Sequence, residues 1–176
     1  MTVGAQNVRY SVSTRDSSLT FEARSTLHGV HGKATGLEGF IDATWEPDGS
    51  VAAEPQPRMH VELPVEQLRS GNAIQDRETW KMIDSRRFPR ISADLRELRP
   101  AAVAGSYAAT GEVTLSGRSR RYEGELTLTR DGERIVVVGE LSVDVRDFGL
   151  KPPNLLIVKV EPVVRVRLHL VATKAE

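Results

Sequence analysis

The chain has no cysteine among its 176 residues, and only 5% of its residues are aromatic. The absence of cysteine excludes disulfide bonds, thiolate catalysis and thiolate metal ligands. The sequence also lacks any run approaching the roughly 20 apolar residues that a membrane-spanning helix needs. Its opening segment, MTVGAQNVRYSVS, has neither the basic start nor the apolar stretch of a signal peptide. We therefore expect a cytoplasmic protein without stable membrane insertion.

Net charge is absent as well, because 24 Lys and Arg residues balance 24 Asp and Glu residues. A neutral chain has no overall field that attracts nucleic acid or an anionic membrane, although it can carry local basic clusters. We expect no nucleic-acid partner. Apolar residues make up 39% and charged residues 27%, as in ordinary globular proteins. The length predicts a single domain over 1–176.

The strongest pattern that is present is the alternation of apolar and polar residues, which is typical of half-buried strands. Phe21 and Ala23 share one face of SLTFEARS, and Val137 belongs to one face of RIVVVGELSVDV. The pair Asp131-Gly132 separates two such runs and indicates a tight hairpin. Successive hairpins with one polar face predict an all-β, eight-stranded antiparallel barrel. We place strands, the first two of which can be one bent strand, at about 8–13, 18–26, 34–46, 57–63, 90–98, 105–116, 119–130, 133–146 and 160–172.

One region, at about 64–86, breaks the alternation and is rich in helix-forming residues. Pro64 suits a first helical position. Gly71 can end a first short helix, and Asn72 can cap a second. We predict a short helical insertion between two strands, lying across one mouth of the barrel.

Glycines interrupt or border several of the alternating runs. Within strands, glycines mark bulges, bends or the close approach of another backbone or of a ligand. A closed barrel needs such bends, so the geometric explanation is the simpler one. The glycines concerned are Gly36, Gly39, Gly111, Gly124 and Gly139.

Five segments, in this order along the chain, carry a resemblance to a known family. They are VRYSVSTRDSSLTFEARSTLHG, GKATGLEGFIDATW, SGNAIQDRETWKMIDSRRFPRIS, GEVTLSGRSRRYEGELTLT and SVDVRDFGLKPP. The series resembles the YceI-like family over roughly residues 8–173. The resemblance implies a lipocalin-like barrel of eight antiparallel strands that binds a polyisoprenoid or another long apolar lipid. The chain departs from the family in GLKPPNLLIVKVEP, whose apolar run could plug one mouth, and in lacking the secretion signal of many relatives.

The predicted barrel interior is compatible with such a ligand. An eight-stranded barrel is wide enough either to fill with side chains or to hold one small molecule. The inward residues are mostly small, and each buried methylene of a ligand contributes about 0.8 kcal/mol. We expect the barrel to bind an apolar small molecule, an isoprenoid or acyl lipid. The predicted lining of its site consists of Phe21, Ala23, Phe40, Trp45, Val61, Leu63, Leu126, Val137 and Leu141, with Trp80 and Met82 at the mouth.

Some of these residues admit a second interpretation. Phe40 and Trp45 have opposite parity along one strand, so one of them faces outward unless a bulge intervenes. Trp80 could equally fasten the helix to the barrel. A phosphate on the ligand would be met by Arg or Lys near a mouth, and Arg118 and Arg120 cluster with Arg121 at one hairpin. A solvated turn is the favoured interpretation of that cluster.

Catalytic motifs are missing: the sequence has no G-x-S-x-G, phosphate loop, dinucleotide glycine pattern or HExxH. In HGVHG, His28 and His31 could ligate a metal with His60 or Glu38, but this spacing recurs by chance. We therefore expect no enzyme, no cofactor and no metal. The alternative function is a filled barrel that acts as an interaction or scaffold module. It would form a homodimer through the apolar segment 155–158.

Overall fold

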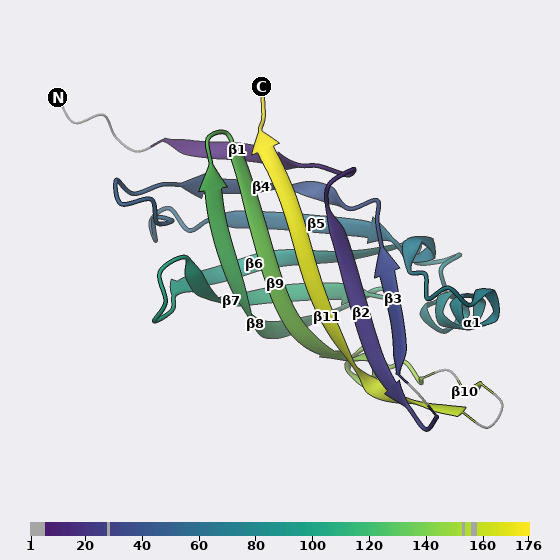
Figure 1. Cartoon of the computed structure of the whole chain (residues 1–176). Helices are drawn as coiled ribbons and strands as arrows, with labels where there is room; N and C mark the ends of the chain where they lie inside the picture. The colour runs from purple at the N-terminus through teal and green to yellow at the C-terminus, as the bar shows by residue number, and fades with distance from the viewer. Residues whose placement is uncertain (1–5, 28, 153, 156–157) are drawn as a thin grey trace.

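The structure is a computed structural model that describes residues 6–27, 29–152, 154–155 and 158–176. Antiparallel strands account for most of it (Figure 1). The strands are β1 (Asn7–Val12), β2 (Ser18–Ser25), β3 (Val30–Ala34), β4 (Glu38–Thr44), β5 (Arg58–Pro64), β6 (Arg90–Pro100), β7 (Ser106–Leu115), β8 (Arg118–Asp131), β9 (Arg134–Asp144), β10 (Asn154–Leu155) and β11 (Val158–Lys174).

Eight of these strands form a closed ring. They neighbour one another in the order β1–β4–β5–β6–β7–β8–β9–β11, and β1 pairs back with β11. The ring confirms the prediction of an all-β, eight-stranded antiparallel barrel. The pairs that close it are Tyr10 with Lys174, Ser11 with Thr173 and Val12 with Ala172.

The strands β1 and β2 act as one bent strand, as the sequence allowed. Both pair with β11, β1 near its end and β2 along the stretch from Val160 to His169. At the bend between them, the Ser17 hydroxyl accepts a hydrogen bond from the backbone N–H of Val171 at 3.0 Å. The two segments run in different directions: β2 lies beside β11 on one face of the barrel, and β1 lies with β4 and β5 on the face behind it (Figure 1).

The strand predicted over 34–46 is present as β4, but it begins only at Glu38. A separate strand that was not predicted, β3, precedes it, because the chain turns a corner between the two at Gly36, whose φ is +78°. A glycine adopts this left-handed conformation without steric cost. The strand β3 therefore pairs with β2, while β4 pairs with β1 and β5. The two-residue strand β10 was not predicted at all.

The predicted helical insertion between β5 and β6 is present. It consists of a 3₁₀ turn, η1 (Val65–Gln67), and one α-helix, α1 (Ala73–Ile83). Asn72 caps α1 as expected, because its side-chain oxygen accepts hydrogen bonds from the backbone N–H groups of Ile74 and Gln75, each at 3.1 Å. Pro64 does not begin a helix but ends β5, immediately before η1.

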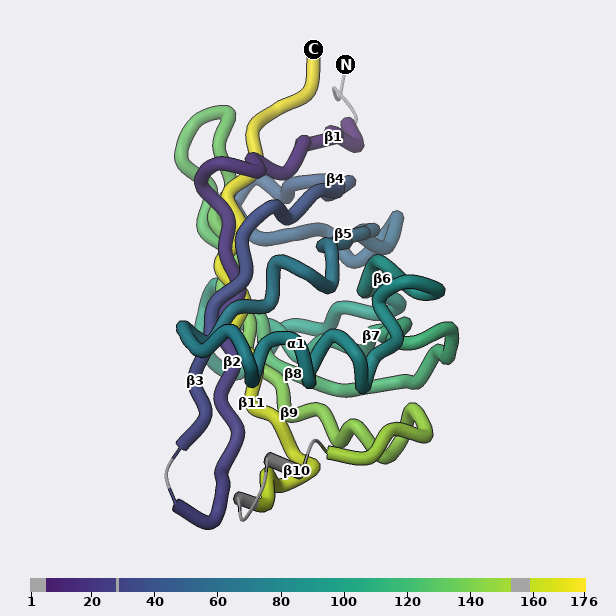
Figure 2. Tube along the Cα trace, turned by 90° about the vertical axis from the view of Figure 1, so that its right-hand side faces the viewer, coloured from purple at the N-terminus to yellow at the C-terminus, as the bar shows by residue number. Residues whose placement is uncertain are grey.

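The connections between strands gather at two ends of the barrel. One end, which we call the insertion end, holds the β2–β3 turn, residues 65–89, the β7–β8 turn and residues 145–152, which include the 3₁₀ turn η2 (Val145–Phe148). The other, the termini end, holds 13–17, 45–57, 101–105, the β8–β9 turn and the chain ends. The helix α1 lies beside β3, away from both chain ends (Figures 1 and 2). No helix of the described residues is long and apolar enough to cross a membrane.

The buried apolar residues form two clusters inside the barrel. The larger one lies toward the termini end and includes Tyr10, Ile135, Val137 and Leu170, each at most 3% exposed. The smaller one lies under the helical insertion and contains Val65, Ile83, Leu115, Val143 and Phe148. The space that concerns function is bordered by members of both clusters.

Candidate functional site: an apolar cavity in the barrel

A cavity of about 300 Å³ lies within the barrel, at the lower limit of common ligand pockets. Its walls come from the inner faces of the strands, and α1 covers one side. Because side chains alternate along a strand, the aliphatic residues of each strand face the cavity together. Typical lining residues are Leu19 from β2, Met59 from β5, Ile91 from β6, Val113 from β7, Val143 from β9 and Val166 from β11.

Seven of the eleven residues that we predicted for the lining border this cavity. The structure brings them together from four strands and α1. They are Phe21, Ala23, Val61, Leu63, Met82, Leu126 and Leu141. Leu19 and Met59 could have been added from the sequence, because they share the parity of Phe21 and Val61. Gln75 and Thr79, on the side of α1 that faces the cavity, carry no such signal.

Phe40 does not border the cavity but lies on the outer face of the barrel. Its ring packs under the Arg9 guanidinium, 4.1 Å from the ring centroid, and beside the His60 ring at 6.0 Å. In β4, Ile41 and Ala43 take the inward positions and are at most 1% exposed. The parity conflict between Phe40 and Trp45 is thus resolved with Phe40 outside.

Trp45 and Val137 do not border the cavity, because they pack in the half of the barrel nearer the termini end. The Trp45 indole N–H donates to the Tyr10 hydroxyl at 2.9 Å, and Arg130 lies 4.8 Å from a Trp45 ring centroid. Val137 is fully buried in the larger cluster. Alternation predicts which residues point inward, but it does not tell how deep along the barrel axis each one lies.

Trp80 also lies outside the cavity lining. Its contacts fit the alternative role that the sequence allowed, which is to fasten the helix. Its indole N–H donates to the carbonyl of Leu68 at 3.0 Å. The Arg69 guanidinium lies 5.6 Å from the ring centroid, and the ring packs against the smaller cluster. The indole thereby holds α1 against the segment that leads into it.

Three glycines in the lining make parts of the wall bare backbone. A Cβ at Gly111 would lie 2.9 Å from the carbonyl oxygen of Asp94, and one at Gly124 would lie 3.0 Å from that of Glu140. Both glycines are therefore required by a close approach of the neighbouring strand. This supports the geometric explanation of these glycines and not a ligand contact. Gly139 is the third.

Polar groups at the cavity are few. At the side formed by α1, the Thr79 hydroxyl donates to the Gln75 carbonyl at 3.1 Å, while the Gln75 side-chain amide has no hydrogen bond within the described residues. The Tyr122 hydroxyl donates to Asp147 at 2.6 Å, and its ring stacks on Phe148. Burial and the adjacent Asp147 carboxylate raise the pKa of Tyr122 well above its usual value, so the phenol stays neutral. No His, Lys, Arg or Cys occurs among the described lining residues.

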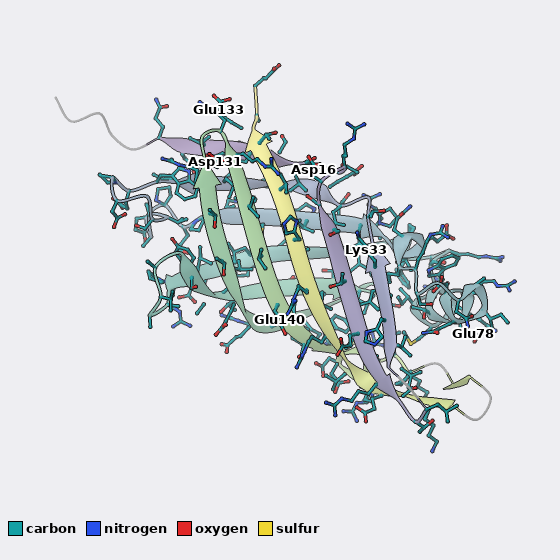
Figure 3. All side chains as sticks on the ribbon, viewed as in Figure 1. Asp16, Lys33, Glu78, Asp131, Glu133 and Glu140 are labelled. Carbon is teal, nitrogen blue, oxygen red and sulfur yellow. The ribbon has the colours of Figure 1, made fainter. Side chains whose placement is uncertain are left out.

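Six acidic residues border the cavity, and three of them, Asp94, Glu112 and Glu140, form ion pairs. Asp94 bonds the His60 ring at 2.8 Å, and Glu140 lies 3.4 Å from Arg165 and 3.3 Å from Arg167. Figure 3 shows Glu140 on the outer face of the barrel. The paired carboxylates therefore direct their charge away from the interior.

The metal site considered for HGVHG is not assembled by the described residues. His28 lies outside them, and His31 is exposed beside Glu22 at 3.5 Å. His60 is occupied by Asp94 and Glu62. No group of three His, Cys, Asp or Glu residues in the described part of the chain could hold a metal ion.

Two further features of the sequence fall at the insertion end. Arg120 donates through Nε to the backbone carbonyl of Asp147 at 2.8 Å, so it ties the β7–β8 hairpin to η2. The segment 155–158, considered for a dimer contact, contains residues 156–157, which lie outside the described residues.

Comparison with known proteins gives one family and several similar folds. The family model of the YceI-like domain matches residues 10–172. The fold is similar to that of BcnA from Burkholderia cenocepacia, with a TM-score of 0.76 and 18% identity over 92% of this chain and 99% of that chain. It is also similar to a polyisoprenoid-binding domain from Saccharophagus degradans implicated in plant cell wall breakdown, with a TM-score of 0.72 and 15% identity over 96% and 99%.

A third similar structure is the YceI protein of Campylobacter jejuni, with a TM-score of 0.66 and 12% identity over 84% of this chain and 86% of that chain. No curated protein sequence matches the chain. At these identities the solved structures establish the similarity of fold.

Proposed function

The chain belongs to the YceI-like domain family, and we propose that it binds one long apolar lipid, an isoprenoid or an acyl chain, inside its barrel. The observation that carries this proposal is the cavity of about 300 Å³ with its aliphatic lining. The polyisoprenoid-binding domain of similar fold supports the isoprenoid class.

The energetics favour a flexible apolar chain as the occupant. A tail of about ten carbons gains about 8 kcal/mol from burial at about 0.8 kcal/mol per methylene, before the cost of association is subtracted. A charged group inside the cavity would find no cation among the described lining residues, and an unpaired buried charge is strongly unfavourable. We therefore place the apolar tail in the barrel and the polar end of the lipid at the α1 side, where the Gln75 amide is available.

We further propose that the protein binds its ligand without transforming it. The Tyr122 hydroxyl in the lining is held neutral and hydrogen-bonded to Asp147. The described lining offers no histidine, lysine or cysteine that could act as a nucleophile or general base.

Native mass spectrometry of the purified protein, followed by organic extraction, tests the proposal. A bound species of defined mass that is lost on denaturation supports it and identifies the lipid class. A ligand-free protein that takes up no offered prenyl or acyl lipid contradicts it. A ligand-free dimer would instead favour the filled scaffold barrel.

A pair of variants on adjacent residues of β7 links the binding to the cavity. Ala109 borders the cavity, whereas Ala108 is exposed on the opposite face of the same strand. Ala109→Trp should fill the cavity and abolish lipid uptake. Ala108→Trp adds the same ring outside and should leave uptake unchanged. Equal uptake by both variants would place the ligand elsewhere.

A further inference from the structure

The connections at the two ends of the barrel differ in the sign of their charge, although the net charge of the chain is zero. The described connections at the termini end carry six acidic residues, Asp16, Glu46, Asp48, Glu54, Glu133 and Glu176, and one basic residue, Arg15. Figure 3 shows Glu133 and its neighbour Asp131 on the hairpin beside the C-terminus.

The insertion end has the opposite sign. Its described connections carry seven basic residues, Arg69, Arg77, Lys81, Arg86, Arg87, Arg146 and Lys151, against five acidic ones, Glu66, Asp76, Glu78, Asp84 and Asp147. Two of those five carboxylates are engaged within the protein: Asp76 is buried and accepts from Ser70, and Asp147 accepts from Tyr122. Two of the basic residues are ion-paired as well, Arg146 with Asp144 at 2.7 Å and Arg87 with Asp84 at 3.9 Å. Arg120 is a further cation at this end, because its side chain donates to the Asp147 carbonyl there.

The helix α1 presents two different faces at this end. Gln75, Thr79 and Met82 border the cavity. Ile74, Arg77 and Lys81 are exposed and follow one another at spacings of three and four residues, so they share the outer face of the helix. Glu78, which is half-buried, lies at the border of this face. Neither Arg77 nor Lys81 has an ion pair within the described residues. Ile74 is 65% exposed, an unusual position for a large aliphatic side chain.

A second exposed aliphatic residue lies at the same end. Leu27, in the turn between β2 and β3, is also 65% exposed. Its neighbours in the chain, Ala23 of β2 and Val30 of β3, both border the cavity. Two exposed apolar side chains, one on α1 and one in the turn between β2 and β3, thus lie at the insertion end of the barrel.

We infer that the insertion end docks on the surface of an anionic lipid bilayer, with Ile74 and Leu27 entering the headgroup region and Arg77 and Lys81 lying on the lipid phosphates. Protein surfaces that lie in a membrane interface combine apolar side chains with Lys and Arg. Each basic residue near an anionic surface adds to binding, while the acidic termini end is repelled and faces away. This orientation turns α1 and the adjoining wall of the cavity toward the membrane.

The inference rests on the proposed function, because a lipid-binding barrel must take up its ligand from a membrane or release it there. Docking through the insertion end would let an apolar tail pass between bilayer and cavity with little exposure to water. Docking itself requires no ligand, so the two ideas fail separately.

Co-sedimentation with vesicles tests the docking. The intact protein should bind vesicles of equal parts phosphatidylcholine and phosphatidylglycerol, bind pure phosphatidylcholine much less, and dissociate when salt is raised. Lys81→Glu should weaken binding about tenfold or more. Ile74→Glu should weaken it similarly, because an acidic group cannot enter the interface.

Matched controls come from the termini end. Val103 is 68% exposed there, and Val103→Glu should leave vesicle binding unchanged, as should Arg134→Glu at the start of β9. Absence of binding to anionic vesicles would overturn the inference, and so would an equal loss in the control variants. Self-association through Ile74, seen by sedimentation velocity, would also overturn it.

Lipid uptake measured without vesicles separates this inference from the proposed function. Uptake of a fluorescent acyl probe by a protein that ignores anionic vesicles would overturn docking alone. Vesicle binding by a protein that takes up no lipid would support docking and contradict the proposed ligand.

Discussion

The side chain of Leu126 occupies the space that a side chain at Gly139 would need. The two residues are partners in the register of β8 and β9, and both border the cavity. A Cβ at Gly139 would lie 2.6 Å from Cδ2 of Leu126. The obstacle is therefore one end of a flexible side chain and not the backbone that restricts Gly111 and Gly124.

This contact predicts a compensating pair of substitutions. Gly139→Val should lower the free energy of unfolding by about 1–3 kcal/mol, because it overpacks the site. Leu126→Ala in the same chain should restore part of that loss, since it vacates the space. Urea unfolding of the two single variants and the double variant gives the coupling energy, which we expect to be at least about 1 kcal/mol. Additive losses would show that Leu126 does not limit position 139.

The two halves of the barrel interior should respond differently to truncation. Ile135 is fully buried in the larger cluster, so Ile135→Ala should cost about 2–5 kcal/mol in unfolding free energy. Leu141 already faces the cavity and is partly exposed, so Leu141→Ala should cost less. Denaturant unfolding of the lipid-free proteins measures both. Equal losses would mean that the cavity wall is packed as tightly as the core.

Ligand binding should show the reverse order for the same two variants. Leu141→Ala changes the wall of the cavity and should alter the chain length of the preferred lipid. Ile135→Ala should leave that preference unchanged. A competition assay with acyl chains of graded length makes the comparison.

The sequence predicted the barrel well because alternation is a local signal that repeats in every strand. It predicted Phe21 and Leu141 at the cavity for the same reason. It failed for Val137, since depth along the barrel axis depends on strand register, which alternation does not encode. It failed at the β3–β4 corner because Gly36 is compatible with both a strand and a turn, and only tertiary pairing decides between them. The exposed face of α1 could not be predicted from the sequence, because it is defined by which face of the helix packs on the cavity.

His60 should make stability depend on pH. Partial burial opposes its protonation, but hydrogen bonds to Asp94 and Glu62 outweigh burial and raise the pKa of His60 above its usual value. A raised pKa in the folded state adds stability that is fully present below the unfolded pKa of about 6.5. That stability is lost as the pH rises through the folded pKa. The free energy of unfolding should therefore fall on going from about pH 6 to about pH 8.

Urea unfolding at both pH values, with His60→Gln as the test variant, checks this dependence. The variant lacks the titrating ring, so its loss of stability over this interval should be smaller than that of the parent protein. His169→Gln removes an exposed histidine from β11 and serves as the control. If His169→Gln reduced the pH dependence as much as His60→Gln, the Asp94 and Glu62 contacts would not be its source.

The two tryptophans should report differently on ligand binding. Trp80 donates to the carbonyl of Leu68, which borders the cavity, whereas Trp45 packs against Tyr10 in the other half of the barrel. Lipid uptake should thus change the emission of Trp45→Phe, which retains Trp80, and leave that of Trp80→Phe nearly unchanged. Trp80→Phe also removes the hydrogen bond to Leu68, which should cost about 0.5–1.5 kcal/mol. Fluorescence titration of both variants with one lipid separates the signals. A response confined to Trp45 would place the ligand toward the termini end, in space that the larger cluster fills in this structure.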